Sequence, residues 1–351
     1  MPLRPLYGHD TVTSRLGAAI QGGRLPQALL FEGPRGVGKQ RVALWAAQTL
    51  LCERGGAEPC NECRSCRMVA SLTHPDLHWF VPLELSKKGA DADKQIELVE
   101  SALGEEMAAR REQPLYGPLS GMAVHSVASV RLLLRHVALT PAMARRKVFI
   151  VGDAERLIPQ RANPEAANAL LKVLEEPPAD TVLILTASEP DALLPTILSR
   201  VVRVRIQRVP DGVVTSFIHQ ELQAENLAAS EAEGCIGRLL ARSQASGLAA
   251  RDASEAFQTA VRGNAVDRYS LALRQTPFQA RGGFTDMLDG LLERLRQEAR
   301  RGAGGDTRRI AEAISLVLQA REQAQGNVNP QLLAAVLGED LAEAGGGRWP
   351  S

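Results

Sequence analysis

The stretch FEGPRGVGKQ, residues 31–40, lies between a short apolar run and an amphipathic one. It resembles the phosphate-binding pattern G-x-x-x-x-G-K-[Ser/Thr], in which backbone N–H groups and a lysine hold phosphates and a hydroxyl binds magnesium. Gly33, Gly36, Gly38 and Lys39 are in place. Position 40 is Gln, whose long amide suits the compact octahedral shell of magnesium poorly. The stretch predicts a nucleotide-binding α/β fold whose metal site is degenerate.

Apolar runs on either side of this loop predict a parallel sheet. The runs are ALLFE (28–32), LHWFVP (77–82), KVFIVG (147–152), TVLILTA (181–187) and VVRVRI (201–206). Near-continuous hydrophobicity is typical of parallel strands that are covered on both faces. Residues 40–52 predict the helix whose N-terminus faces phosphate, and Asn163-Pro164 and Pro177-Pro178 bracket a second helix. The fold class that follows is α/β.

A hydrolysing site of this kind also needs a magnesium-binding carboxylate at the end of a neighbouring strand, followed by a carboxylate that orients water. The candidate is KVFIVGDAERL, residues 147–157. Here Gly152 stands at the metal-binding position and Asp153 at the water-orienting one. A neighbouring residue cannot simply substitute, because side chains alternate in direction along a strand. Two magnesium ligands are therefore missing, which favours a fold that no longer hydrolyses nucleotide.

Four of the five cysteines are close together, as Cys52, Cys60, Cys63 and Cys66. Their spacing, C-x7-C-x2-C-x2-C, lets one short loop bring four thiolates onto a tetrahedral zinc ion. Four cysteines leave no open position for water, so the site is structural and His74 is not needed as a ligand. A redox pair or an accidental cluster is the alternative. The fifth cysteine, Cys235, lies in an amphipathic stretch and is expected to be a buried apolar residue.

The chain has 351 residues, enough for two or three domains, and its net charge of +1 argues against a strongly basic nucleic-acid-binding surface. No apolar run approaches the roughly 20 residues that a membrane helix needs. The start, MPLRPLYGHD, lacks the apolar core of a signal peptide. We expect a cytoplasmic protein with no membrane partner.

Three domains are expected along the chain. Residues 1–208 form the α/β domain, which carries the cysteine module at 52–66 and a polar surface insertion at 83–121. Residues 209–250 form a small helical domain, with a boundary near 245–252, and residues 251–344 a helical C-terminal domain. Residues 345–351, rich in glycine, are expected to be a disordered tail.

The order of motifs resembles a known family. The phosphate loop and the four cysteines are followed by HPDLHWF (74–80), NALLKVLEEPP (168–178) and LTASEPDALLPTILSR (185–200). This order is similar to that of the bacterial clamp loaders of the AAA+ class, in which the second and third domains are a lid and a collar. Loss of both magnesium ligands makes the chain most similar to the delta prime type of DNA polymerase III subunit, rather than to the ATP-hydrolysing tau/gamma type.

The resemblance implies a function. ILSR, residues 197–200, resembles the Ser-Arg-Cys motif of clamp loaders, which makes Arg200 the arginine that would act in trans on a neighbouring subunit's ATP; Val201 replaces the cysteine. A non-hydrolysing stator would work with tau/gamma and delta subunits to load a sliding clamp onto primer-template DNA, as a component of the polymerase holoenzyme. The alternative for Arg200 is an ordinary surface arginine. Zinc is the expected cofactor; the residues argue against magnesium and do not establish that ATP binds.

Two groups of charged residues carry lesser expectations. Lys172, Glu175 and Glu176 fall on the polar side of their helix and predict a solvated face or a subunit contact. Residues 145–147, Arg-Arg-Lys, predict a solvated basic loop, with DNA contact as the alternative. Two rival functions stay open: a tau/gamma-like motor that uses Asp153 in an unusual metal shell, and a zinc-containing DNA-binding repair factor.

Overall fold

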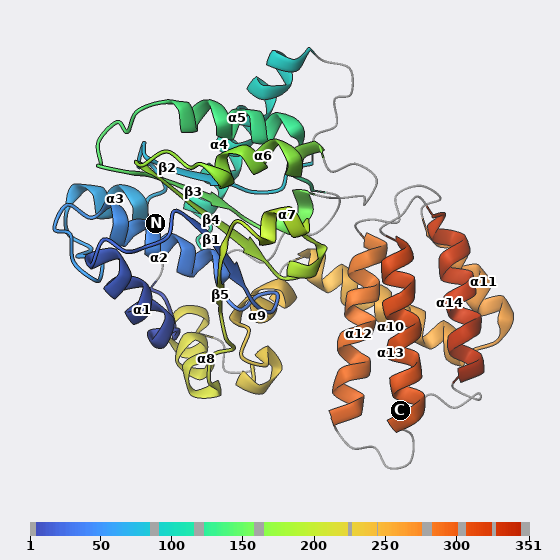
Figure 1. The fold of residues 1–351 in the computed structure, drawn as a ribbon. Helices are drawn as coiled ribbons and strands as arrows, with labels where there is room; N and C mark the ends of the chain where they lie inside the picture. Colours follow the sequence, from blue (N-terminus) through green and yellow to red (C-terminus); the bar gives the residue numbers. More distant parts are fainter. Residues whose placement is uncertain are drawn as a thin grey trace. The chain divides into compact units, whose positions relative to one another are not determined.

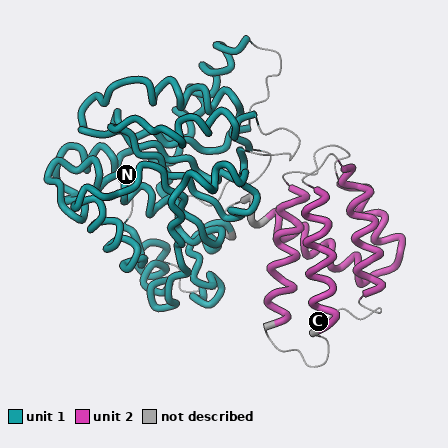
Figure 2. The backbone as a smooth tube through the Cα atoms, viewed as in Figure 1, with its two compact units in different colours: residues 1–119, 123–241 teal, residues 120–122, 242–351 magenta. Residues whose placement is uncertain are grey.

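The computed structural model describes residues 5–84, 91–115, 123–157, 165–223, 227–243, 245–275, 283–300, 307–324 and 328–344. These residues form two compact units, one ending at residue 241 and the other beginning at residue 242 (Figure 2). None of the helices in the described ranges is long and apolar enough to cross a membrane.

A five-stranded parallel sheet is the frame of the first unit (Figure 1). Its strands are β1 (Ala28–Glu32), β2 (Leu77–Phe80), β3 (Lys147–Val151), β4 (Thr181–Ala187) and β5 (Val202–Arg205). They lie in the order β2-β3-β4-β1-β5, and every neighbouring pair is parallel. Each strand expected from an apolar run is confirmed. Strands β3 and β4 are buried along their whole length, whereas β5 is a largely exposed edge.

The register of the sheet determines which strand ends lie next to the candidate site. Glu32 at the end of β1 is opposite Ala187 at the end of β4, and Val151 at the end of β3 is opposite Leu185. Because the strands are parallel, the loops that follow β1, β3 and β4 leave from the same edge of the sheet. Ligands of such sheets bind at that edge.

Helices cover both faces of the sheet, as near-continuous apolar strands require (Figure 1). Helix α2 follows the phosphate loop and packs against β1, β3 and β4 from one face, while α5 and α6 lie on the other. The helices of this unit are α1 (Asp10–Gln21), α2 (Lys39–Leu51), α3 (Arg64–Ala70), α4 (Ala92–Glu112), α5 (Val127–Ala138), α6 (Glu165–Glu175), α7 (Pro195–Leu198), α8 (Asp211–Phe217) and α9 (Ile236–Ser243). Shorter helical turns are η1 (Ala154–Leu157), η2 (Pro190–Ala192), η3 (Ile218–Leu222) and η4 (Ala229–Ala232).

Two segments differ in detail from the sequence analysis. Helix α4 lies within the expected surface insertion, but it buries Ile96, Val99 and Leu103 in the same core as the sheet. Lys147 was expected in a solvated basic loop, and that is wrong. Its side chain is 2% exposed, and its ammonium donates to the carbonyl oxygens of Val137, at 2.8 Å, and Leu139, at the end of α5. Lys147 is therefore a structural cap of α5.

Residues 209–239 have a small apolar core of their own within the first unit. It comprises Val209, which precedes α8, and Val214, Ile218, Ala232 and Leu239, which α8, η3, η4 and α9 carry. The main core of the unit lies between the sheet and its flanking helices.

The second unit consists of helices and short connections in its described residues. Its helices are α10 (Ala245–Arg262), α11 (Ala265–Arg274), α12 (Gly283–Arg300), α13 (Thr307–Ala324) and α14 (Pro330–Ala344). They bury a separate core, to which Leu288, Leu291 and Val317 contribute fully buried side chains. Helix α10 runs through residues 245–252, where the sequence analysis expects a domain boundary. The expected tail, 345–351, lies outside the described residues, as does the helix start at Asn163-Pro164.

Candidate functional site

The phosphate loop connects β1 to α2 at the ligand-binding edge of the sheet, as predicted. Gly36 and Gly38 have positive φ angles of 79° and 104°, which an L side chain rarely adopts. The loop hydrogen-bonds to β4, since the Gly33 N–H donates to the Ala187 carbonyl oxygen at 3.3 Å. Its backbone thus has the conformation that the glycines predict.

Lys39 is turned onto its own loop. Its ammonium donates to the carbonyl oxygens of Gly33 at 2.9 Å and Pro34 at 3.0 Å, and to Ser188 Oγ at 2.8 Å. These bonds use all three N–H donors of a lysine, and the side chain is only 5% exposed. Burial lowers the pKa of Lys39, against the carboxylates of Glu155 and Asp153, which raise it. A phosphate would have to displace these partners to bind the ammonium.

Gln40 lies where a metal-binding side chain on residue 152 would project. A Cβ atom built on Gly152 would fall 2.8 Å from Gln40 Nε2 and 2.9 Å from Gln40 Cδ, closer than real Cβ contacts. The Gln40 amide also donates to Asp153 Oδ2 at 3.2 Å, so it uses the carboxylate that might otherwise serve a metal. Both departures from the magnesium-binding pattern therefore meet at one point.

The start of α9 lies directly on the phosphate loop. The Gly237 N–H donates to the Gly36 carbonyl oxygen at 2.8 Å, and a Cβ on Gly237 would lie 2.7 Å from Gly36 Cα. A pocket of about 150 Å³ lies at this contact. Loop residues 36–41 line it together with Asp153 and Ser188, and Tyr7, Leu115 and Phe217 add apolar side chains. The start of α9 thus covers Gly36, while Gly38, Lys39 and Gln40 border a pocket.

Glu155 completes the polar network behind the loop. Its Oε1 accepts the Ser188 N–H at 3.0 Å. Burial and the neighbouring Asp153 carboxylate raise the pKa of Glu155 to about 7. Lys39, Ser188, Glu155, Asp153 and Gln40 thereby form a set of polar groups directed largely at one another.

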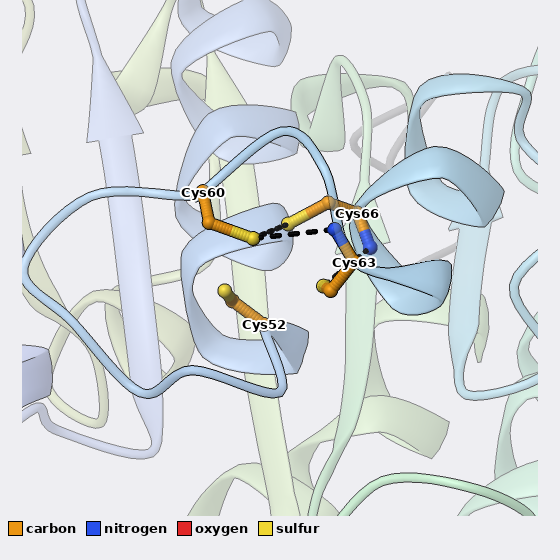
Figure 3. Close-up of side chains that lie close together, drawn as sticks. All are labelled: Cys52, Cys60, Cys63 and Cys66. Carbon is orange, nitrogen blue, oxygen red and sulfur yellow. Dashed lines mark hydrogen bonds between the residues drawn. The ribbon is translucent and has the colours of Figure 1, made fainter.

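The four cysteines converge as predicted (Figure 3). Their sulfur atoms all lie within 4.8 Å of one another, and those of Cys60 and Cys66 are 3.8 Å apart. Cys52 caps the end of α2, Cys63 caps the start of α3 and Cys66 lies in the first turn of α3. Two helix ends therefore hold three of the four thiols, and the chain between them delivers Cys60.

The surroundings of the cysteines suit a metal. The Cys63 N–H donates to Cys60 Sγ and the Cys66 N–H to Cys63 Sγ, both at 3.3 Å. Backbone N–H groups of Cys63 and Glu62 lower the pKa of Cys60 to about 6, whereas burial raises the pKa of Cys66. N–H donors that favour thiolates are the environment a coordinating cysteine needs. His74 is not in this group, as expected, and Cys235 is fully buried, as predicted.

Arg200 lies between α7 and β5. Because β5 is parallel to β1 and Val202 is opposite Leu29, Arg200 is at the edge where β1 begins, whereas the phosphate loop follows the other end of β1. Its Nε donates to Glu175 Oε1 at 2.8 Å, and Nη2 contacts the same oxygen. Its Nη1 donates to the Thr196 carbonyl oxygen at 2.8 Å and to Ser199 Oγ at 3.2 Å. The side chain is 31% exposed. The guanidinium is therefore within reach of a partner molecule but held by its own chain.

Three residues of these sites, Ser188, Glu155 and Gly237, and the pairing of Glu175 with Arg200 are not predicted from the sequence. Ser188 follows β4 directly and Glu155 lies in η1 shortly after β3, so the parallel sheet predicts that both approach the loop. The Gly237 contact and the Glu175–Arg200 pair join distant parts of the chain. No local pattern indicates either of them.

Comparison with known proteins places the chain in a family. Residues 8–210 match the family model described as DNA polymerase III, delta subunit. DNA polymerase III subunit delta′ of Bacillus subtilis is 34% identical over 205 residues, 58% of this chain and 49% of that protein. The subunit delta′ of Pseudomonas aeruginosa is 38% identical over 192 residues, 54% of this chain and 45% of that protein. The matched stretch spans about half the length of these relatives.

Among solved structures, a gamma subunit-related protein from Thermotoga maritima is 15% identical and superposes with a TM-score of 0.47, over 96% of this chain and 99% of that one. So distant a likeness adds nothing to the assignment. The family match rests instead on the α/β domain, and it takes in the phosphate loop, the four cysteines and Arg200. Because it covers more than half of the residues, the chain belongs to the DNA polymerase III delta subunit family.

Proposed function

We propose that the chain is a non-hydrolysing, delta prime-type subunit of a DNA polymerase III clamp loader. The observation that carries this proposal is the Gln40–Gly152 contact, because the amide fills the space that a magnesium carboxylate would need. The Gln40 amide also binds the Asp153 carboxylate, which further supports a site that does not turn over ATP. The subunit would act as a stator in the cytoplasm, helping to load the sliding clamp onto primer-template DNA.

Arg200 would supply the chemistry that this chain contributes. It matches the arginine of the clamp-loader motif, its side chain is partly exposed, and it lies at the edge of the sheet opposite the chain's own phosphate loop. In a complex it would reach the ATP of a neighbouring tau/gamma subunit. A guanidinium supplied in trans stabilises the charge of the transferring phosphoryl group, an effect worth about 10³- to 10⁵-fold in rate.

Zinc is the metal that suits the four cysteines best. A Zn–S distance of about 2.3 Å implies S···S separations of about 3.8 Å in a tetrahedron. The Cys60–Cys66 separation is 3.8 Å, and all four sulfurs lie within 4.8 Å. Cys52, Cys60, Cys63 and Cys66 would hold the ion as a structural site that joins α2 to α3.

The second unit would provide the contacts with tau/gamma and delta. Helices α11 and α14 pack against each other, yet each keeps large apolar side chains exposed. We define the α11/α14 apolar surface as Val266, Tyr269, Leu273, Leu332 and Val336, which are 49–72% exposed. Exposed apolar side chains on neighbouring helices are suited to helix–helix association. We also propose that residues 209–250 are a lid and residues 251–344 a collar, with α10 (Ala245–Arg262) running across this boundary.

Substitution of Arg200 tests the proposal. Arg200→Ala should leave the isolated chain folded and able to assemble, since a partly exposed surface arginine adds little to a core. Complexes reconstituted with it should lose ATP turnover at the adjacent site and load clamps more slowly. Arg200→Lys should not restore activity, because an ammonium lacks the planar fork of a guanidinium. Unchanged DNA-stimulated ATPase and clamp loading, at equal assembly, would overturn the role of Arg200.

A further inference from the structure

The guanidinium of Arg200 is almost fully engaged within the chain. Of its five N–H donors, Nε and one of Nη2 point to Glu175 Oε1, and both of Nη1 point to Thr196 and Ser199. One N–H remains for any other partner. A guanidinium binds phosphate most strongly through two parallel N–H groups. In this arrangement Arg200 cannot offer such a pair.

Glu175, which accepts the hydrogen bond from Arg200 Nε, belongs to another helix. Glu175 is the last residue of α6, and α6 lies beside α7, whose end leads into Arg200 (Figure 1). A carboxylate at a helix C-terminus is disfavoured by the helix dipole, so its position does not serve α6 itself. A nearby cation offsets that cost. Glu175 and Arg200 are thus matched to each other across two helices.

The same pair is easily exchanged. The Glu175 side chain is 47% exposed and that of Arg200 31%, so water screens their attraction. A phosphate carries more charge than a carboxylate and accepts the same bidentate pair of N–H groups. An incoming triphosphate can therefore replace Glu175 without any change in the fold of the chain.

We propose that Glu175 is a latch, a positioning residue that holds Arg200 in an inactive orientation until a neighbouring subunit's ATP exchanges with it. The inference rests on the proposed function of Arg200. The latch lowers the rate at which the neighbouring site hydrolyses ATP before the assembly has closed around DNA. Once the phosphates displace Glu175, the Nε edge of Arg200 becomes available to them.

The test uses complexes reconstituted with tau/gamma and delta at equal assembly. Glu175→Gln removes the charge but keeps an acceptor of the same shape, and it should raise ATP turnover without DNA by about two- to five-fold, as expected for loss of a screened ion pair. Glu176→Gln is the matched control, because it removes the same charge from the same end of α6, and it should leave the rate at the wild-type value. The double variant Glu175→Gln/Arg200→Ala should turn over no faster than Arg200→Ala alone.

A second readout does not depend on activity. In the ¹⁵N-labelled isolated chain, the Arg200 Nε–H signal is assigned by its loss in Arg200→Ala. Its rate of exchange with water should rise in Glu175→Gln and stay unchanged in Glu176→Gln. If ATP turnover without DNA stays equal or falls in Glu175→Gln, while Arg200→Ala still lowers turnover, the latch is overturned and the function of Arg200 stands. No effect of Arg200→Ala would overturn both.

Discussion

The side-chain amide of Gln40 occupies the space directly in front of the Gly152 Cα atom, so that a Cβ there would lie 2.8 Å from Gln40 Nε2. The two residues that depart from the magnesium-binding pattern are therefore in contact. Each accommodates the other: the glycine leaves room for the long amide, and the amide fills the volume that a carboxylate would take. A Cβ at position 152 would require the Gln40 amide to shift, and a shorter side chain at position 40 would lose the hydrogen bond to Asp153.

This contact predicts a strong coupling between the two positions. Gly152→Asp alone should lower the free energy of unfolding by about 1–3 kcal/mol, because the new side chain overpacks against Gln40. Combined with Gln40→Thr, which shortens the opposing side chain, it should recover much of that loss. Urea unfolding of the two single variants and the double variant gives the coupling energy, expected to be about 0.5–3 kcal/mol for residues in contact.

Gly104 provides the control for this cycle, because nothing lies within 4 Å of a Cβ built on it. Gly104→Ala should stabilise the chain by up to about 1 kcal/mol through helix propensity. Gly152→Ala should destabilise it. If both glycines tolerate alanine equally, the contact with Gln40 does not constrain position 152.

The isolated chain should show no ATP turnover above background in the presence of magnesium. Position 40 lacks the hydroxyl, and position 152 lacks the carboxylate, that would bind magnesium. Lys39 donates to Gly33, Pro34 and Ser188. A steady-state phosphate-release assay on pure protein measures this directly. Turnover that disappears in Lys39→Ala would show that the site is active and favour a tau/gamma-like motor.

The sheet could be predicted because each strand is a short apolar run bounded by polar or turn-forming residues. The phosphate loop likewise has a local pattern, and its place after β1 follows from that pattern. The cysteine group could be predicted because its ligands lie within fifteen consecutive residues, from Cys52 to Cys66. In all three cases the information is contained in a short stretch of sequence.

The remaining contacts depend on how distant elements pack. Glu175 has the appearance of a solvent-facing residue on its helix, and only the position of α7 brings Arg200 to it. Lys147 belongs to a basic run in the sequence, yet it begins a central strand and is buried beneath the end of α5. The burial of α4 could not be predicted from its polar sequence, because its three buried apolar residues are spaced along a long helix. Such features are decided by tertiary packing, which outweighs local character.

Zinc should be present at about one ion per chain. Cys63→Ser should release it, because three cysteine ligands and a serine no longer form the tetrahedral thiolate shell. The thermal midpoint should fall as well, by about 2–4 °C for each kcal/mol lost. Metal analysis and thermal unfolding check both effects. Cys235→Ala is the control: it alters a buried cysteine in another part of the unit and should keep the metal.

Acid should destabilise the chain partly through His125. This side chain is buried, its Nε2 lies 2.7 Å from the Gly152 carbonyl oxygen, and burial lowers its pKa to about 4. Between the ordinary pKa of about 6.5 and 4, the unfolded chain binds a proton that the folded chain does not, so the free energy of unfolding falls as pH falls through this window. The contribution approaches about 1.4 kcal/mol per pH unit.

Urea midpoints of wild type and His125→Gln at pH 7 and pH 5 test this account. The variant is less stable at pH 7, because a shorter side chain fills the site, but the decrease from pH 7 to pH 5 should be smaller than in wild type. An equal decrease would assign the acid sensitivity to other groups. His78, whose pKa burial also lowers to about 4, acts in the same direction and remains in both proteins.

Assembly should depend on the α11/α14 apolar surface if the second unit forms the collar. Leu273 is 70% exposed, so Leu273→Glu should change the free energy of unfolding by less than about 0.5 kcal/mol. In a complex, however, the same carboxylate would be buried against a neighbouring subunit without a partner, which costs several kcal/mol. Binding to tau/gamma and delta, measured by size-exclusion chromatography or light scattering, should weaken by more than tenfold.

Leu318→Glu makes the same change at a 43% exposed leucine on α13 and should leave assembly intact. Full assembly of Leu273→Glu at low subunit concentration would place the contacts on another face of these helices.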